Sequence, residues 1–280
     1  MEQRIITIFY LIDEYLKTIG IKDDKRAKVS NSEILLIGYI AMEDFNGNYY
    51  KAYQYVREMK IVKMLEYTRF IRRINKLESV IEKLFLWLAE LFKRLEGAQI
   101  YSVDSFPVEL CQISREKRCR LYNDEKLKGF NASKNRYFYG FKVHMVVNTN
   151  KEPIFFYISE GSMHDVKASY HFLPFVPKNS IVIGDKGYVS DDLDNFLSKF
   201  GIKLSPIFRK NMKKDNEYLI KRKIRKSIET AFSIITGKFG KVIKATSIGG
   251  FLTKLKLFIL TYSFDCFLKL DKDKQNLLFN

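Results

Sequence analysis

The stretch "IVIGDKGYVSDD", residues 181–192, changes from apolar to polar within four positions. Three branched aliphatic side chains, Ile181 to Ile183, are typical of a strand that is covered on both faces. Gly184 and Asp185 then end the run. Since Gly and Asp commonly follow strands as turn residues, a simple turn is one interpretation of Asp185. The alternative is a carboxylate that the end of a buried strand presents to a cleft.

Strand and helix patterns alternate on both sides of this stretch. We expect strands at residues 99–106, 137–148, 153–160, 180–185 and 202–208, with a hairpin turn at 148–151. Helices are expected at residues 165–175, 190–200 and 217–239. Three adjacent strands, followed by alternating helices and strands, predict an α/β fold with a mixed five-stranded sheet and flanking helices.

The first 96 residues have the periodicity of helices. Ser30 and Glu33 have capping-box spacing ahead of an apolar run, and no proline occurs before Pro107. We therefore predict three segments. They are an all-helical N-terminal region at residues 1–96, an α/β domain at 97–270 and a C-terminal tail at 271–280.

The charge of the chain is its most unusual bulk property. Its 280 residues include 49 Lys and Arg against 32 Asp and Glu, which gives a net charge of +17. Such an excess favours a polyanionic partner, first nucleic acid and second an anionic membrane surface, although a merely basic surface is the simpler alternative.

Residues 1–17 are expected to form an amphipathic helix rather than a signal peptide, and charges interrupt the apolar run at 251–268, so no membrane span is expected. Three cysteines without metal or redox spacing are expected to be reduced, as in the cytoplasm.

Three carboxylates occupy distinctive positions in this pattern. Asp104 interrupts the first strand, Asp185 ends the fourth, and Glu229 borders the apolar stripe of the long helix. If the first and fourth strands are neighbours, all three can face one cleft. Carboxylates that converge raise one another's pKa, and hard divalent cations such as Mg²⁺ relieve that repulsion. Two such ions, ~3.5–4 Å apart, can activate a water or a 3′-hydroxyl for attack on a phosphodiester. Carboxylates that can bind metal ions, together with Lys and Arg side chains that can bind phosphate, indicate an enzyme that cuts or joins nucleic acid.

The same order of carboxylates resembles the ribonuclease H-like catalytic core of DDE transposases. Six local strings between residues 99 and 264 are similar to the insertion sequence 982 family of bacterial transposases. They are "VDSFPVELC", "RCRLYN", "SKNRYFYGFKVHMVV", "GSMHDV", "GDKGY" and "RKSIETAFSII". The resemblance implies that residues 97–270 are the catalytic domain, and that Asp104, Asp185 and Glu229 are the catalytic triad that binds two Mg²⁺ or Mn²⁺ ions.

The resemblance also marks departures around Glu229. Arg225 matches an arginine that many relatives carry four positions before the glutamate, whereas Arg222 stands where a tyrosine is common. Thr236 replaces the lysine that is often found seven positions after the glutamate, and Lys238 is the nearest base. These departures bear on phosphate positioning and leave the triad intact.

Two basic tracts are candidate DNA-binding surfaces. Residues 113–136 carry 8 bases against 3 acids and are expected to form an extended loop; residues 203–244 carry 13 against 3. A solvated face is the alternative for both. The DNA-binding candidates are Arg118, Arg120, Lys134, Arg136, Lys186, Arg222, Arg225 and Lys226. At another strand-to-helix junction, Asp165 is expected to be a helix N-cap, with a role for its neighbour His164 in positioning substrate as the less favoured option.

These observations predict an insertion-sequence transposase of the bacterial cytoplasm, associated with the nucleoid. It would bind DNA, namely the terminal inverted repeats of its own element and the target, and act as a homodimer in a synaptic complex. Two alternatives remain. One is a different ribonuclease H-like nuclease, and the other is a non-catalytic DNA-binding protein derived from a transposase. The N-terminal helices are expected to bind DNA, to mediate dimerisation or to give structural support.

Overall fold

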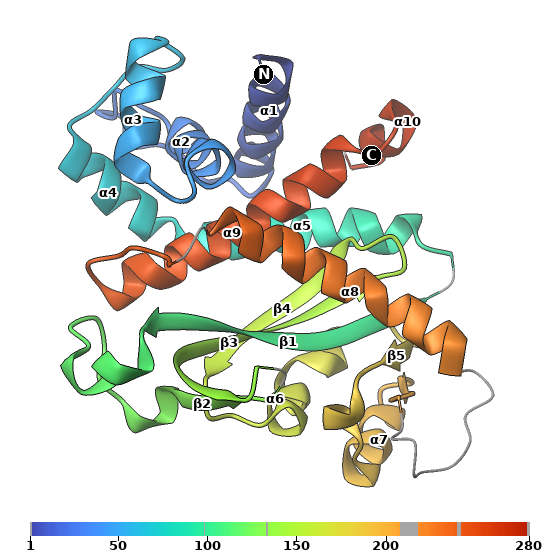
Figure 1. The fold of residues 1–280 in the computed structure, drawn as a ribbon. Helices are drawn as coiled ribbons and strands as arrows, with labels where there is room; N and C mark the ends of the chain where they lie inside the picture. Colours follow the sequence, from blue (N-terminus) through green and yellow to red (C-terminus); the bar gives the residue numbers. More distant parts are fainter. Residues whose placement is uncertain (1, 98, 133, 208–217, 240–241, 279–280) are drawn as a thin grey trace. The chain divides into compact units, whose positions relative to one another are not determined.

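The computed structural model describes residues 2–97, 99–132, 134–207, 218–239 and 242–278 (Figure 1). Two compact units make up the chain. The first comprises Met1–Leu88 with Ile235–Asn280, and the second comprises Ala89–Ile234. Residues 235–270, which the sequence pattern groups with the α/β domain, therefore share their contacts with the N-terminal helices.

The first unit is helical in all of its described elements. These are α1 (Glu2–Thr18), α2 (Asn31–Asp44), α3 (Tyr49–Glu58), α4 (Tyr67–Lys76), α9 (Ile248–Leu268), α10 (Lys272–Asn276), most of α5 (Glu78–Leu95) and the end of α8 (Tyr218–Lys238). The predicted capping box begins α2, because Ser30 Oγ accepts from the Glu33 backbone N–H while Glu33 accepts from the Ser30 N–H. Helix α2 is buried on nearly every side and packs against α9.

Ion pairs within the first unit hold two of its part-buried lysines, Lys238 and Lys256. Lys256 lies 2.5 Å from a Glu78 oxygen and 2.6 Å from a Glu82 oxygen. Lys238 pairs with Glu43 and with Asp265. Across the described ranges, no helix combines the length and the apolar character that crossing a membrane requires.

The second unit contains a mixed sheet of six strands. They are β1 (Ile100–Cys111), β2 (Lys128–Asn131), β3 (Arg136–Asn148), β4 (Pro153–Glu160), β5 (Ile181–Ile183) and β6 (Lys203–Leu204). The order is β2-β3-β1-β5-β6, and β4 also pairs with β3. β3 runs antiparallel to β1, β2 and β4, whereas β5 runs parallel to both β1 and β6. The predicted α/β class is confirmed, with a mixed sheet, flanking helices and a helical region before it, but the sheet has six strands where five were expected.

The sixth strand, β2, corrects the expectation that residues 113–136 form an extended loop. This tract contains short 3₁₀ turns at Ile113–Arg118 and Glu125–Leu127 and then β2. The fully buried Leu127 anchors the tract beside β3. Gly129 lets β2 approach the end of β4 closely, because a Cβ at this position would lie only 2.2 Å from the Gly161 carbonyl oxygen. These contacts join residues that lie far apart in the chain.

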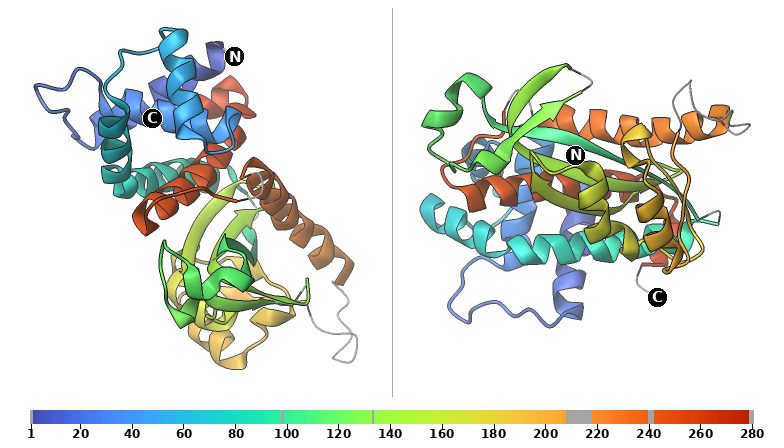
Figure 2. Two further views of the ribbon diagram at one scale, coloured as in Figure 1. Left: turned by 60° about the vertical axis from the view of Figure 1, so that its left-hand side comes forward. Right: turned by 90° about the horizontal axis from the view of Figure 1, so that it is seen from below.

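Helices cover the two faces of the sheet (Figures 1 and 2). On one face, Phe232 of α8 packs on Phe106, with ring centroids 4.6 Å apart. On the other face, Phe172 of α6 (Asp165–Phe172) contacts the rings of His144 and Tyr157. Helix α7 (Asp191–Ser198) packs against β6. Because side chains alternate along a strand, β1 presents Asp104 to the α8 side and its neighbour Ser105 to the α6 side.

Candidate active site

The candidate site lies beside β1, past the point where the pairing of β1 with β5 ends. β1 pairs with β5 only from Ile100 to Ser102, and the last pair joins Ser102 to Ile183. Beyond that pair, β1 continues while β5 ends in Gly184 and Asp185. Asp104 and Asp185 therefore occupy matching positions, each two residues past the same pair on parallel neighbours. The condition that the sequence left open, adjacency of the first and fourth strands, is met.

Asp104 is largely buried at this position. Its side chain is 17% exposed, its Oδ1 accepts from the Ser105 backbone N–H at 2.8 Å, and its Oδ2 accepts from Arg225 at 3.2 Å. Burial raises the pKa of Asp104 to about 6; Arg225 opposes this rise, and the negative charge of Asp185 adds to it. The ionised carboxylate is thus only partly compensated, despite its arginine partner.

Arg225 links Asp104 to Glu229. One of its terminal nitrogens lies 3.2 Å from Asp104 Oδ2 and 3.4 Å from Glu229 Oε1. The second contact is an i, i+4 pair on α8, the helix whose apolar side packs on the sheet. Glu229 remains half exposed. The guanidinium of Arg225 therefore contacts two carboxylates, one from β1 and one from α8.

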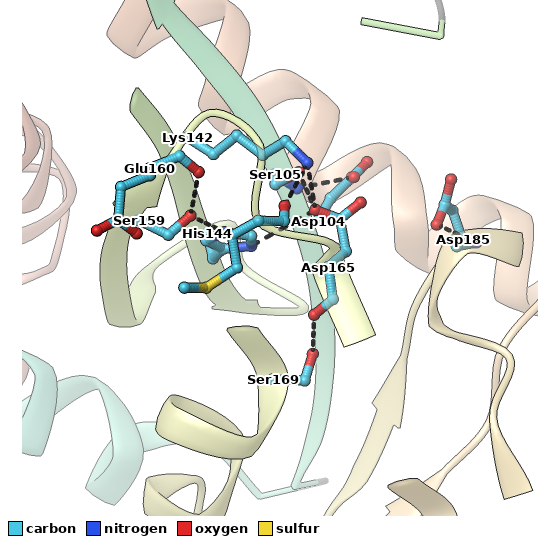
Figure 3. Close-up of polar contacts among 11 residues, drawn as sticks. Asp104, Ser105, Lys142, His144, Ser159, Glu160, Asp165, Ser169 and Asp185 are labelled. Carbon is cyan, nitrogen blue, oxygen red and sulfur yellow. Dashed lines mark hydrogen bonds and ion pairs between the residues drawn. The ribbon is translucent and has the colours of Figure 1, made fainter. Parts of the chain in front are cut away.

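Asp185 begins a 3₁₀ turn, Lys186–Tyr188, and its Oδ1 accepts from the Gly187 backbone N–H at 2.7 Å. Figure 3 shows Asp185 on this turn, apart from the polar cluster around Asp104. Its negative charge nevertheless contributes to the raised pKa of Asp104. The two interpretations of Asp185 are therefore compatible: it caps a turn, and it lies at the candidate site.

Asp165 is a fourth carboxylate of this neighbourhood, and its predicted role as an N-cap is wrong. His164 is the N-cap residue of α6, is exposed and makes no side-chain cap bond. Asp165 is the first helical residue, and its Oδ1 accepts from Ser105 Oγ at 2.9 Å (Figure 3). Lys142 Nζ lies 3.4 Å from the same oxygen. Ser105 and Lys142 lie 60 and 23 positions away from Asp165 in the chain. The sequence around Asp165 therefore shows a His-Asp pair at a strand-to-helix junction but does not show these contacts.

Two buried polar side chains face this cluster. His144 is fully buried, its Nε2 lies 2.9 Å from Ser159 Oγ, and burial lowers its pKa to about 4, so the ring is neutral at pH 7. Tyr188 is also fully buried, and burial followed by the charges of Asp165, Asp104 and Asp185 raises its pKa. Neither His144 Nδ1 nor the Tyr188 hydroxyl has a hydrogen-bond partner in the described part of the chain.

The donor set has the chemistry of a divalent-cation site. Asp104, Asp185 and Glu229 offer hard oxygen ligands, and the cation shared by two of them is Arg225. Within the ranges that the structure describes, no three His, Cys, Asp or Glu side chains are already arranged around a common metal position. Burial raises the pKa of Asp104, so a further positive charge beside it would favour its ionised form.

The predicted DNA-binding residues fall into two groups. Arg225 lies within the carboxylate site, and Arg136 is exposed but pairs with Glu109 at 2.5 Å. The exposed remainder are Arg118, Arg120, Lys134, Lys186, Arg222 and Lys226. Lys238, the base nearest after Glu229, is taken up by its two carboxylate partners in the first unit. Part of the second basic tract, residues 208–217 and 240–241, lies outside the described residues.

Comparisons with known proteins assign the chain to a family. A family model described as "Transposase DDE domain" matches residues 94–240, which is more than half of the chain. No curated protein sequence matches. Among solved structures, the chain is similar to a piggyBac transposase in a synaptic complex with hairpin DNA, at 8% identity and a TM-score of 0.42, covering 98% of this chain and 76% of that one. From the extent of the family match, this protein belongs to the family of transposases that carry a DDE domain.

Proposed function

We propose that this protein is an insertion-sequence transposase that cuts and joins DNA by metal-dependent phosphodiester hydrolysis and strand transfer. The observation that carries the proposal is the shared contact of Asp104 and Glu229 with Arg225, beside Asp185 at the matching position of the neighbouring strand. Membership of the DDE transposase family and the net charge of +17 support it. The six sequence strings favour the insertion sequence 982 family as the finer assignment.

Asp104, Asp185 and Glu229 would hold one or two Mg²⁺ or Mn²⁺ ions at the candidate site. Bound there, such an ion supplies an activated water or 3′-hydroxyl and neutralises charge on the leaving oxygen. Ser105 fixes one oxygen of Asp104 through its backbone N–H, which orients the carboxylate. Arg225 has a second role open to it, because its planar fork can hold a phosphate when it releases Asp104.

DNA is the proposed partner, as the terminal inverted repeats of the element and as target DNA. The exposed bases Arg118, Arg120 and Lys134 suit contacts to the phosphate backbone, which position DNA without reading its sequence. Strand transfer joins two DNA ends to one target, and this requirement favours a homodimer in the synaptic complex. The helices of residues 1–96 are available for end recognition or for dimerisation.

A nicking assay tests the proposal. Purified protein would be incubated with Mg²⁺ and labelled DNA that carries the repeats flanking its own coding sequence. We expect nicks at the repeat ends for the wild type, and none above background for Asp104→Asn, Asp185→Asn or Glu229→Gln. Asp192→Asn, which removes an exposed acid from the first turn of α7, is the matched control and should nick normally.

Two further substrates separate the rival functions. Cleavage of RNA–DNA hybrids or branched DNA, without preference for the repeats, would instead identify another ribonuclease H-like nuclease. Repeat binding without nicking, in either Mg²⁺ or Mn²⁺, would identify a non-catalytic DNA-binding protein.

A further inference from the structure

The two oxygens of Asp165 have different surroundings. Oδ1 accepts from Ser105 Oγ at 2.9 Å and lies 3.4 Å from Lys142 Nζ, which itself donates to the Met163 carbonyl oxygen at 2.8 Å. His144 Nδ1 is 3.7 Å from the same oxygen. For Oδ2, no hydrogen bond to any described residue is found. The carboxylate is therefore fixed through one oxygen while the other is left for a ligand.

Asp165 and Asp185 both lie near the position that a Cβ atom of Gly187 would occupy. A Cβ built on Gly187 would lie 2.8 Å from Asp185 Oδ1 and 3.6 Å from Asp165 Oδ2. Carboxylate oxygens from two different elements, the turn after β5 and the first residue of α6, thus border the same position. Gly187 is exposed, so an ion from solvent can reach this position.

The hydroxyl of Tyr188 is a second polar group of this neighbourhood that lacks a partner. Its ring is fully buried, yet its hydroxyl has no partner among the described residues. A buried hydroxyl without a partner costs free energy, and such groups in folded proteins usually meet a water, an ion or a ligand. The charges that act on this hydroxyl are those of the site, with Asp165 first, then Asp104 and Asp185.

We propose that Asp165 is a fourth carboxylate of the active site, whose Oδ2 forms, with Asp185 Oδ1, a subsite for a divalent cation beside Gly187. This inference rests on the proposed function and extends it, since the triad of Asp104, Asp185 and Glu229 does not include Asp165. Mg²⁺ and Mn²⁺ suit the subsite, because Mg²⁺ is commonly held by one or two carboxylates and keeps several waters. Lys142 neutralises part of the charge of Asp165, which limits the repulsion between the two carboxylates before the ion binds.

The alternative is that Asp165 has only a structural task and ties β1 to α6 through Ser105. Two substitutions separate these roles. Asp165→Asn keeps an oxygen that can accept from Ser105 but removes the charge that a cation needs. Gly187→Ala keeps both carboxylates in the sequence but puts a methyl carbon 2.8 Å from Asp185 Oδ1, so the Asp185 side chain has to shift away from the shared position. Gly187 does not have a positive φ, so alanine causes no backbone strain of that kind.

The test is Mn²⁺ binding to the full-length chain without DNA, measured by isothermal titration calorimetry and by electron paramagnetic resonance of the free ion. We expect Asp165→Asn and Gly187→Ala each to weaken binding at the subsite at least ~10-fold. Asp192→Asn should bind as the wild type does. Far-UV circular dichroism and Tm of all four proteins control for folding, and Gly187→Ala keeps the test decisive if Asp165→Asn does not fold.

The subsite would be overturned if Asp165→Asn and Gly187→Ala both bound Mn²⁺ as tightly as the wild-type protein. It would also be overturned if the wild-type protein bound no Mn²⁺. The nicking assay separates this failure from failure of the proposed function. If Asp165→Asn binds normally while Asp104→Asn stops nicking, the subsite is wrong and the transposase stands. If Asp165→Asn and Gly187→Ala lose Mn²⁺ while the wild type nicks no DNA, the subsite stands and the function is wrong.

Discussion

Asp104 shows how burial of a single carboxylate at the candidate site affects the stability of the fold. Its folded pKa, about 6, exceeds the ordinary value of 3.8, chiefly because the carboxyl is buried. The folded state therefore binds this proton more tightly than the unfolded state does. Each unit of such a difference corresponds to about 1.4 kcal/mol. The contribution is fully present below the unfolded pKa and is lost as the pH rises through about 6.

The first prediction follows from this sign. Asp104→Asn, which cannot ionise, should have a higher Tm than the wild type at pH 7.5 without divalent ions. The advantage should shrink as the pH falls from 6 towards 4, since the wild-type carboxyl is then protonated as well. Calorimetry of both proteins over this range checks it. A difference in Tm that is constant with pH would show that ionisation of Asp104 does not destabilise the fold.

Arg225 and Lys223 provide a second contrast between single residues. Arg225 is half buried and contacts both Asp104 and Glu229, whereas Lys223 is exposed on the same helix. We expect Arg225→Ala to reduce the nicking rate far more than Lys223→Ala, because only the first change removes a cation from the carboxylate site. Tm values show whether both variants remain folded. Equal and small effects would mean that the basic run before Glu229 is only a solvated surface.

At the scale of elements, local patterns predict some features and long-range pairings decide the others. Residues 137–148 and 153–160 could be predicted as strands, because their apolar runs end in a recognisable turn, and β3 and β4 occupy almost the same ranges. β2 could not, since its four residues become a strand only by pairing with β3. The fold class could therefore be predicted from local patterns, whereas the number of strands depends on long-range pairing.

In the candidate site, too, local patterns mark some residues, while the contacts between residues depend on long-range packing. Asp104 and Asp185 stand out locally because they interrupt apolar strands. The contact of Arg225 with Asp104 spans 121 positions, and no pattern near either residue predicts its geometry. The surroundings of Asp165, on which the proposed cation subsite rests, could not be predicted from the sequence, because they depend on Ser105 of β1 and Lys142 of β3.

The third prediction concerns the approach of β2 to the end of β4. Gly129→Ala should lower the free energy of unfolding by about 1–3 kcal/mol, because its Cβ would collide with the Gly161 backbone oxygen and the Phe138 ring. Gly97→Ala is the matched control, since nothing lies within 4 Å of a Cβ at that position. Urea unfolding of both variants measures the difference. A Gly129→Ala protein as stable as the wild type would show that this close approach is not required.

At the scale of the whole molecule, the net charge of +17 is expected to dominate DNA affinity. The fourth prediction compares Arg136, which has a carboxylate partner, with two basic side chains for which the described residues provide none. Arg118→Ala and Lys134→Ala should each reduce the slope of log affinity against log salt by ~0.9 for every phosphate of duplex DNA that the variant no longer neutralises. Arg136→Ala should reduce it less, because Glu109 already neutralises Arg136. Fluorescence anisotropy over a range of salt concentrations measures the slopes. Slopes equal to that of the wild type in all three variants would exclude this surface from DNA binding.

The central claim is that carboxylates of the candidate site bind the ion that drives DNA cleavage. Asp185→Cys tests it most directly, because a thiolate is a softer ligand that disfavours Mg²⁺ and accepts more thiophilic ions such as Mn²⁺. The measurement is the rate of nicking at the element's terminal repeats in each ion, with Asp192→Cys as the control. If Asp185 binds the ion, Asp185→Cys should not nick DNA in Mg²⁺ and should regain nicking in Mn²⁺, while the control behaves as the wild type in both ions. Wild-type nicking by Asp185→Cys in Mg²⁺ would contradict it.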